Sequence, residues 1–180
     1  LRFEEFGYVQ GEIKYYEVHK APFFDTQGKL LGTVGSSRDI TEMILIKKEL
    51  EEQKHFLDYQ ANHDALTQLP NRVLFQAYLE QSLIRSHTSG QKVALLFIDL
   101  DHFKNINDAY GHDRGDEVLH IISDRIQQVI RQTDKLCRIG GDEFALIVDD
   151  YWQFNDLTHL SNRILKTIKQ PIVLNNIIYH

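Results

Sequence analysis

The sequence predicts an α/β fold of the α+β type, in which helices flank a central, mostly antiparallel sheet. The apolar run at 91–101 ends in acidic residues, as expected for a strand buried on both faces. Residues 134–150 contain two apolar runs joined by a double glycine, which favours a tight hairpin. Segments 116–132 and 152–170 lie before and after this hairpin and are typical of amphipathic helices, the second ending at Pro171.

Composition narrows the range of functions. Hydrophobic residues make up 42% of the 180 residues, enough for one or two globular units. The net charge of -6 argues against a general nucleic-acid binder, although a metal ion would still allow an anionic small ligand. The single cysteine, Cys137, lies in an apolar run and is interpreted as a small buried residue. We expect no zinc site from the histidine spacing, and no membrane segment.

The first part of the chain combines strands with a long helix. Residues 2–9, 13–24 and 29–40 read as strands that form two hairpins. Residues 39–64 contain no glycine or proline, and apolar residues recur every seven positions at Met43, Leu50 and Leu57. This seam indicates either a helix that packs on its own domain or a parallel coiled coil between two protomers.

The segment at 65–90 predicts a loop followed by a helix. Asn71 is a suitable N-cap, and Leu74, Tyr78 and Leu79 are expected to share a face with Leu83. The end of the sequence, 171–180, predicts a hairpin that turns at Asn175 and Asn176.

Two acidic clusters stand at strand ends and suggest chemistry. If the strand at 91–101 lies beside the hairpin, Asp99 would face Asp142, and two converging carboxylates would bind a hard cation such as Mg²⁺. Such a cation is used in phosphoryl and nucleotidyl transfer. Lys104 would add a positive charge for a phosphate, and Gly140 and Gly141 would let a phosphate approach the backbone. The alternative is that both clusters are solvated turns.

These motifs together resemble the GGDEF-domain diguanylate cyclases, bacterial enzymes that condense two GTP into cyclic di-GMP. The signature is Gly140-Gly141-Asp142-Glu143-Phe144, and "DALTQLPNR" at 64–72 matches the opening motif of the family. "FIDLDHFKNINDAYGHDRGDEVL" matches its first strand and the helix after it. The resemblance runs from about residue 62 to the end, and implies a fold similar to nucleotidyl cyclase and palm domains.

The resemblance implies roles for individual residues. Asp99, the backbone carbonyl of Leu100, and Asp142 would hold Mg²⁺ or Mn²⁺. Either Asp142 or Glu143 would accept the proton of the attacking ribose hydroxyl, and the choice between them stays open. Lys104 would steady charge on the phosphates. The residues expected at the substrate are Asn107 and Asp116, which would read guanine, together with His112, Phe103, Gly140 and Gly141. The alternative role of His112, given equal weight, is to cap its loop.

A second site is implied by Arg131 and Asp134, since an R-x-x-D at this offset from the double glycine is the inhibitory product site of the family. Arginine suits phosphates and purine rings, whereas an ion pair at a helix end is the simpler explanation. Residues 1–40 resemble the C-terminal part of a PAS sensor domain. The expected organisation is therefore 1–40 PAS part, 41–62 linker helix of coiled-coil type, and 63–180 GGDEF domain, which we expect to be incomplete at its C-terminus.

The leading hypothesis is a homodimeric cyclase with GTP as substrate and cyclic di-GMP as product and inhibitor, controlled by the PAS sensor. Two protomers would meet through the linker helix and facing GGDEF domains, without nucleic acid as a partner. The expected location is cytoplasmic, with any membrane attachment of a parent protein lying upstream. The runner-up is an inactive module that binds cyclic di-GMP or GTP as a regulatory receptor. A third hypothesis is a structural dimerisation unit that binds no nucleotide.

Overall fold

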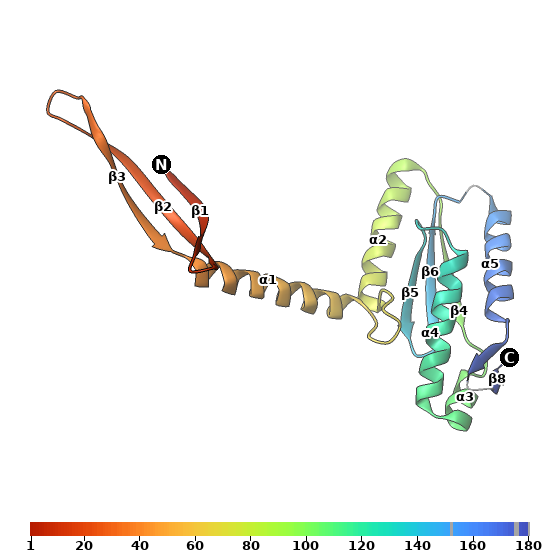
Figure 1. Ribbon diagram of the computed structural model, residues 1–180. Coiled ribbons are helices and arrows are strands. Elements are labelled where there is room, and N and C mark those ends of the chain that lie inside the picture. The colour runs from red at the N-terminus through yellow and green to blue at the C-terminus, as the bar shows by residue number, and fades with distance from the viewer. Residues whose placement is uncertain (152, 175–176, 180) are drawn as a thin grey trace. The chain divides into compact units, whose positions relative to one another are not determined.

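The computed structural model describes residues 1–151, 153–174 and 177–179. The chain divides into two compact units, residues 1–57 and residues 58–180, and each is described by itself. Helix α1 (Thr41–Asn62) begins in the first unit and ends in the second. The predicted fold class is confirmed, because antiparallel sheets and helices make up the structure (Figure 1).

The first unit is a three-stranded antiparallel sheet in the order β1-β2-β3. Strands β1 (Arg2–Val9), β2 (Glu12–Phe24) and β3 (Leu30–Asp39) form the two hairpins that the sequence predicts. Among residues 1–57, all of which the structure describes, only Val18 and Ile40 are buried apolar side chains. The sheet therefore has little core of its own, as expected for a thin layer without a second layer against it.

Helix α1 has no buried residue along its length. The heptad positions Met43, Ile46, Leu50 and Leu57 are all more than half exposed. The apolar seam is thus uncovered in the single chain, which is the condition that a helix-to-helix interface requires.

The second unit is built on a three-stranded sheet in the order β4-β6-β5. Strand β6 (Glu143–Asp149) pairs antiparallel with both β4 (Val93–Asp99) and β5 (Lys135–Gly140). The central strand is buried from Phe144 to Val148, because both its edges are paired and both its faces are covered.

One expectation for strand β4 was wrong. The sequence predicted a strand buried on both faces, but Leu95 and Phe97 are exposed, Phe97 by 67% of its surface. Strand β4 lies at the sheet edge, and α2 contacts it less than β5 and β6. The face that carries Leu96 and Ile98 packs against the main core, while the other face is only partly covered by α2. An apolar run cannot by itself distinguish an edge strand from a central one.

Helices cover both faces of the sheet (Figure 1). Helix α2 (Arg72–Ser89) packs on one face over Cys137, Ala145 and Ile147. Helices α4 (His112–Val129) and α5 (Phe154–Ile168) pack on the other face, where alternate residues of β6 enter the main core. On α4 the predicted stripe is confirmed, with Val118, Ile122 and Ile126 buried and Val129 half-buried.

The start of α2 agrees with the sequence, but part of its predicted face does not. The Asn71 side chain accepts hydrogen bonds from the backbone N–H groups of Val73 and Leu74, at 2.9 and 3.2 Å, and so caps the helix. Leu83 is 55% exposed, however, while Phe75 and Ser82 are buried. The face that packs on β5 and β6 therefore includes Phe75 and Ser82, each next in sequence to a residue of the predicted face, Leu74 and Leu83.

The chain closes with strands β7 (Ile172–Leu174) and β8 (Ile177–Tyr179), which pair antiparallel. The predicted turn residues Asn175 and Asn176 lie outside the described residues.

Cys137 is fully buried, and burial raises the pKa of its thiol to about 12, in agreement with a packing role. Within the part of the chain that the structure describes, no helix is both long and apolar enough to cross a membrane.

Candidate active site

The double glycine lies where β5 returns into β6. Gly140 and Glu143 are paired across the two strands, so Gly141 and Asp142 are the two residues of the turn. Gly141 has a φ of +36°, a region that side chains disfavour, and this explains a glycine at the position. The predicted tight hairpin, with two carboxylates at its tip, is therefore present.

The register of the neighbouring strand brings a third carboxylate to the same end of the sheet, and this end is called the acidic edge below. Asp99, the last residue of β4, is the Cα partner of Glu143. Directly opposed residues lie about 4.5 to 5.5 Å apart between Cα atoms, with their side chains on one face of the sheet. Asp142 is the next residue toward the turn and is half-buried, while Asp99 and Glu143 are exposed. The carboxylate directly opposite Asp99 thus belongs to Glu143 rather than to Asp142.

The acidic edge supplies only part of the ligand set that a divalent cation needs. In the described residues, no three side chains of the His, Cys, Asp or Glu type converge as a complete metal cage. Magnesium in phosphoryl-transfer sites usually takes one or two carboxylates and fills its remaining positions with phosphates and water. Asp99, Asp142 and the backbone of Leu100 offer a donor set of that kind.

Helices α3 (Phe103–Tyr110) and α4 continue from the same edge, because α3 starts four residues after Asp99. Lys104 is exposed on α3, and His112 and Asp116 are exposed on α4. Asn107 is half-buried on α3 and lies against Gly115 of α4. A Cβ at Gly115 would meet Asn107 Oδ1 at 2.0 Å, so only glycine leaves room for this side chain. Asn107 is thereby held beside the residue that precedes Asp116.

A cavity of about 290 Å³ opens between this edge and α5. Asp99, Leu100 and Phe103 line it, together with apolar residues of α3, α4 and α5 and with Lys169. Phe103 is buried and belongs to the main core, so it contributes a wall to the cavity rather than an exposed contact.

At the opposite end of β5, Arg131 and Asp134 line a second cavity, of about 460 Å³. The carboxylate of Asp134 accepts a hydrogen bond from the Arg131 backbone N–H at 2.8 Å, while no side-chain ion pair joins the two among the described residues. Asp134 Oδ1 is buried and has no hydrogen-bond partner. Burial raises the pKa of Asp134, and the hydrogen bond from Arg131 opposes the rise.

Sequence reasoning missed three residues of these sites. Arg163 of α5 lines the cavity of Arg131 and Asp134 and acts electrostatically on Asp134, but nothing in its sequence context marked it. Gly115 could not be identified from the sequence, because the need for glycine arises from the close approach of Asn107 on α3. Arg138, two residues before the double glycine, has polar partners at the turn, and its only signal was a charge within an apolar strand.

Comparison with protein families assigns both units. The profile of the diguanylate cyclase GGDEF domain matches residues 61–180. The profile of a PAS fold matches residues 2–44. The first match covers most of the chain.

Two proteins of Pseudomonas aeruginosa illustrate the sequence similarity. The diguanylate cyclase TpbB is 39% identical over 127 residues, which are 71% of this chain and 29% of TpbB. The cyclic di-GMP phosphodiesterase NbdA is 40% identical over 127 residues, 71% of this chain and 16% of NbdA. The chain therefore spans less than a third of the length of these relatives.

Solved structures show the same likeness. The GGDEF domain of TpbB superposes with a TM-score of 0.63 at 38% identity, covering 65% of this chain and 69% of that one. The GGDEF domain of DgcB from Caulobacter crescentus, solved in complex with c-di-GMP, has a TM-score of 0.61 at 28% identity. That match covers 66% of this chain and 70% of the DgcB domain.

Proposed function

The chain belongs to the GGDEF family of diguanylate cyclases, with a PAS-fold segment ahead of its GGDEF domain. On this premise we propose that it condenses two GTP into cyclic di-GMP and two pyrophosphates. The observation that carries the proposal is the pairing of Asp99 with Glu143, beside Asp142 in the turn. It places two carboxylates opposite each other at the ends of β4 and β6, with a third in the adjacent turn, next to helices that offer groups for a nucleotide.

The proposed organisation has three parts. Residues 1–40 are the C-terminal part of a PAS sensor, 41–62 a linker helix and 63–180 the GGDEF domain. The division into compact units near residue 57 and the uncovered seam of α1 support a linker between two separately folded parts. In this arrangement the sensor governs how often two cyclase domains meet.

Substrate recognition rests on α3 and α4. Asn107 and Asp116 bind the guanine, since a carboxylate accepts from its ring N–H and its amino group while adenine offers no such pair of donors. His112, at the start of α4, is proposed to contact the same nucleotide. Phe103 lines the neighbouring cavity of about 290 Å³, which Asn107, His112 and Asp116 do not line. Lys104 contributes a positive charge toward the phosphates, and the backbone of Gly140 and Gly141 admits them closely.

Catalysis takes place at the acidic edge. Asp99, Asp142 and the Leu100 carbonyl would hold Mg²⁺ or Mn²⁺, which supplies positive charge to phosphate oxygens when bound. Asp142 or Glu143 accepts the proton of the ribose 3′-hydroxyl as that oxygen attacks the α-phosphate of the second GTP. The bond to pyrophosphate breaks as the new ester forms, and the second ester forms in the same way.

Each site holds one GTP, so two protomers must face each other for the reaction. The exposed heptad seam of α1 is suited to pairing two chains and to raising the effective concentration of the domains. Sedimentation of the chain, compared with a variant in which Leu50 is replaced by Lys, tests this step. The variant should sediment as a monomer and lose turnover at low protein concentration.

Product inhibition is proposed at the cavity of Arg131 and Asp134. Arg131 and Arg163 supply cationic groups for the phosphates, and Asp134, whose Oδ1 is buried without a partner, lines the same cavity as a hydrogen-bond acceptor. An acceptor that is buried without a partner is costly, and a ligand that donates to it recovers that cost.

The direct test is incubation of the chain with GTP and Mg²⁺, followed by chromatography of the nucleotides. We expect cyclic di-GMP from GTP and no cyclic dinucleotide from ATP. Asp142→Asn should reduce the rate by about 10³-fold, because it removes a proposed metal ligand at the reacting phosphate. Asp150→Asn, an equal charge change in the exposed turn after β6, is the matched control and should keep the parent rate. An Asp142→Asn protein with the parent rate would refute the assignment.

The alternative is a receptor that binds GTP or cyclic di-GMP without turnover. The relative NbdA supports this alternative, because it contains a similar segment but is named a cyclic di-GMP phosphodiesterase rather than a cyclase. Titration calorimetry distinguishes the two together with the chromatography: a receptor binds nucleotide and makes no product. A purely structural unit would bind neither.

A further inference from the structure

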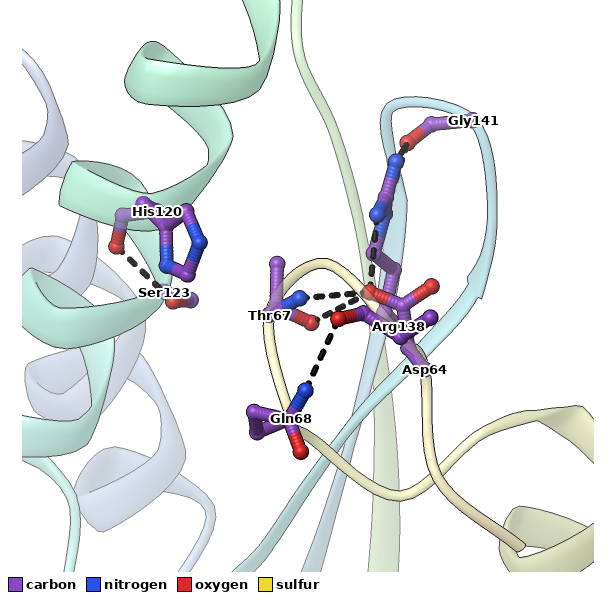
Figure 2. Close-up of polar contacts among 8 residues, drawn as sticks. Asp64, Thr67, Gln68, His120, Ser123, Arg138 and Gly141 are labelled. Atoms are coloured by element: carbon purple, nitrogen blue, oxygen red, sulfur yellow. Dashed lines mark hydrogen bonds and ion pairs between the residues drawn. The ribbon is translucent and has the colours of Figure 1, made fainter. Parts of the chain in front are cut away.

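The side chain of Arg138 joins the GGDEF turn to a distant loop. Its Nε and Nη2 donate hydrogen bonds to the carbonyl oxygen of Gly141, at 2.9 and 2.8 Å. Its Nη1 donates to Asp64 Oδ1 at 2.8 Å, as Figure 2 shows. The side chain of Arg138 is only 12% exposed, although Gly141 itself lies at the surface. One guanidinium therefore uses three donors on two segments that lie far apart in sequence.

The loop on the other side of this bridge is itself held firmly. Asp64 Oδ1 also accepts from the backbone N–H of Thr67 at 2.8 Å and from its hydroxyl at 2.7 Å (Figure 2). Burial raises the pKa of Asp64, but the hydrogen bonds from Thr67 and Arg138 outweigh it and hold the pKa below its ordinary value. Asp64 is thus charged at neutral pH and has a fixed position, which makes it a rigid anchor for Arg138.

Backbone bonds complete the attachment. The N–H of Arg138 donates to the Pro70 carbonyl at 2.9 Å, and His63 and Pro70 form an isolated bridge. The N–H of Asn71 donates to the carbonyl of Asn62, the last residue of α1, at 2.9 Å. The loop at 63–70 is therefore closed upon itself, tied to the helix end before it, and tied to β5 beside the turn.

The consequence for the turn follows from the planarity of the peptide unit. The Gly141 carbonyl and the Asp142 N–H belong to one peptide plane, so a carbonyl held by two donors also sets the backbone orientation of Asp142. From this geometry we infer that Arg138 is a positioning residue, which aims the Asp142 carboxylate by clamping the Gly141 carbonyl against the Asp64 loop. The inference rests on the proposed function, since Asp142 belongs to its active edge.

The chain offers a matched comparison for this role. Arg85 of α2 pairs with Asp149 at 2.8 Å, the same distance as between Arg138 and Asp64. Asp149 is the last residue of β6, at the opposite end of the strand from the turn. A general contribution of arginine–aspartate pairs to stability would appear in both pairs, whereas positioning of Asp142 would appear only with Arg138.

The test compares Arg138→Lys with Arg85→Lys in the 180-residue chain, because lysine keeps the charge but lacks the planar fork. We expect Arg138→Lys to lower kcat about 10- to 100-fold while KM for GTP changes less than about threefold, the pattern of a lost transition-state interaction. Arg85→Lys should leave the initial rate within about twofold of the parent, as a surface ion pair far from the turn should.

Hydrogen exchange of the backbone amides gives a readout that needs no catalysis. Arg138→Lys, and also Asp64→Asn in the distant loop, should speed exchange at residues 141–143, while Arg85→Lys should not. If the parent chain makes no cyclic di-GMP but exchange responds in this way, the proposed function fails and the clamp stands. Unchanged exchange at the turn overturns the inference, and so does a parent-like kcat for Arg138→Lys in an active chain.

Discussion

Asp64 and Asp134 are aspartates at opposite ends of the same sheet, and their surroundings differ in one respect. Asp64, beside the GGDEF turn, accepts from Thr67 and from Arg138, and its pKa lies below the ordinary value. Asp134, before the start of β5, accepts one backbone hydrogen bond and keeps a buried oxygen without a partner. Burial accordingly raises its pKa.

The difference teaches how one residue type serves two purposes. Burial penalises the ionised form of both aspartates, so the number of hydrogen-bond donors decides whether the charged carboxylate is stabilised or destabilised. With its donors supplied from within the chain, Asp64 is suited to a fixed internal contact. Asp134 lines a cavity together with Arg131 and Arg163, and its Oδ1 is buried without a partner, so the residue is suited to a ligand that brings its own donors.

Of the two ends, the turn end is expected to show the larger effect, because the proposed guanine site there depends on close packing of α3 against α4. Gly115→Ala should weaken GTP binding about 10- to 100-fold, because the new Cβ would meet Asn107 Oδ1 at 2.0 Å and displace it. Titration calorimetry with GTP measures the loss. Gly7→Ala is the matched control, since a Cβ there meets nothing within 4 Å. Equal GTP affinity of the Gly115→Ala and Gly7→Ala proteins would contradict the placement of Asn107 at the base.

A smaller effect is expected at the cavity end. Arg131→Ala should raise the cyclic di-GMP concentration needed for half-inhibition about tenfold, because a desolvated arginine–phosphate contact is lost. Progress curves with and without added cyclic di-GMP give this value. If the substitution left inhibition unchanged, the cavity would not be the product site, and the contrast between the two ends would lose its functional meaning.

The smallest effects concern stability, and the two aspartates should respond to pH in opposite directions. The pKa of Asp64 is lowered by folding, so its stabilisation is complete above the unfolded pKa of about 3.9 and is lost as pH falls through the folded pKa. The pKa of Asp134 is raised, so its contribution is complete below about 3.9 and is lost as pH rises through the folded pKa.

Urea unfolding of Asp64→Asn and Asp134→Asn between pH 3 and pH 7, followed by circular dichroism, measures these contributions. Relative to the parent chain, Asp64→Asn should lose stability toward neutral pH, and Asp134→Asn should gain it. Parallel pH dependences in both variants would show that the donors counted at each carboxylate do not control its ionisation.

Local features of the fold could be predicted because local physics produces them. The boundaries of the first three strands follow from turn residues between apolar runs, and Asn71 caps α2 through its own neighbours. The buried stripe of α4 follows from helical periodicity, and the double glycine correctly indicated a hairpin. None of these features depends on which elements are neighbours in space.

Other features were missed or wrong because they depend on distant partners. The apolar run of β4 predicted burial on both faces, but sheet order places it at an edge and exposes Phe97. The face of α2 was misplaced at Leu83 because its orientation is set by β5 and β6. The placement of Asp99 opposite Glu143 depends on the register between β4 and β6, which is set by the packing of side chains from segments distant in sequence.

The sequence alone thus determined which segments become helices, strands and turns, and which chemical groups stand at their ends, because spacing, capping and turn geometry act over a few residues. Only the tertiary structure decided which of these groups meet, as in the contact of Arg138 with Asp64 and Gly141 and in the unpartnered oxygen of Asp134. The physical reason is that the free energy of such a contact depends on the burial and the donors that several distant elements supply jointly.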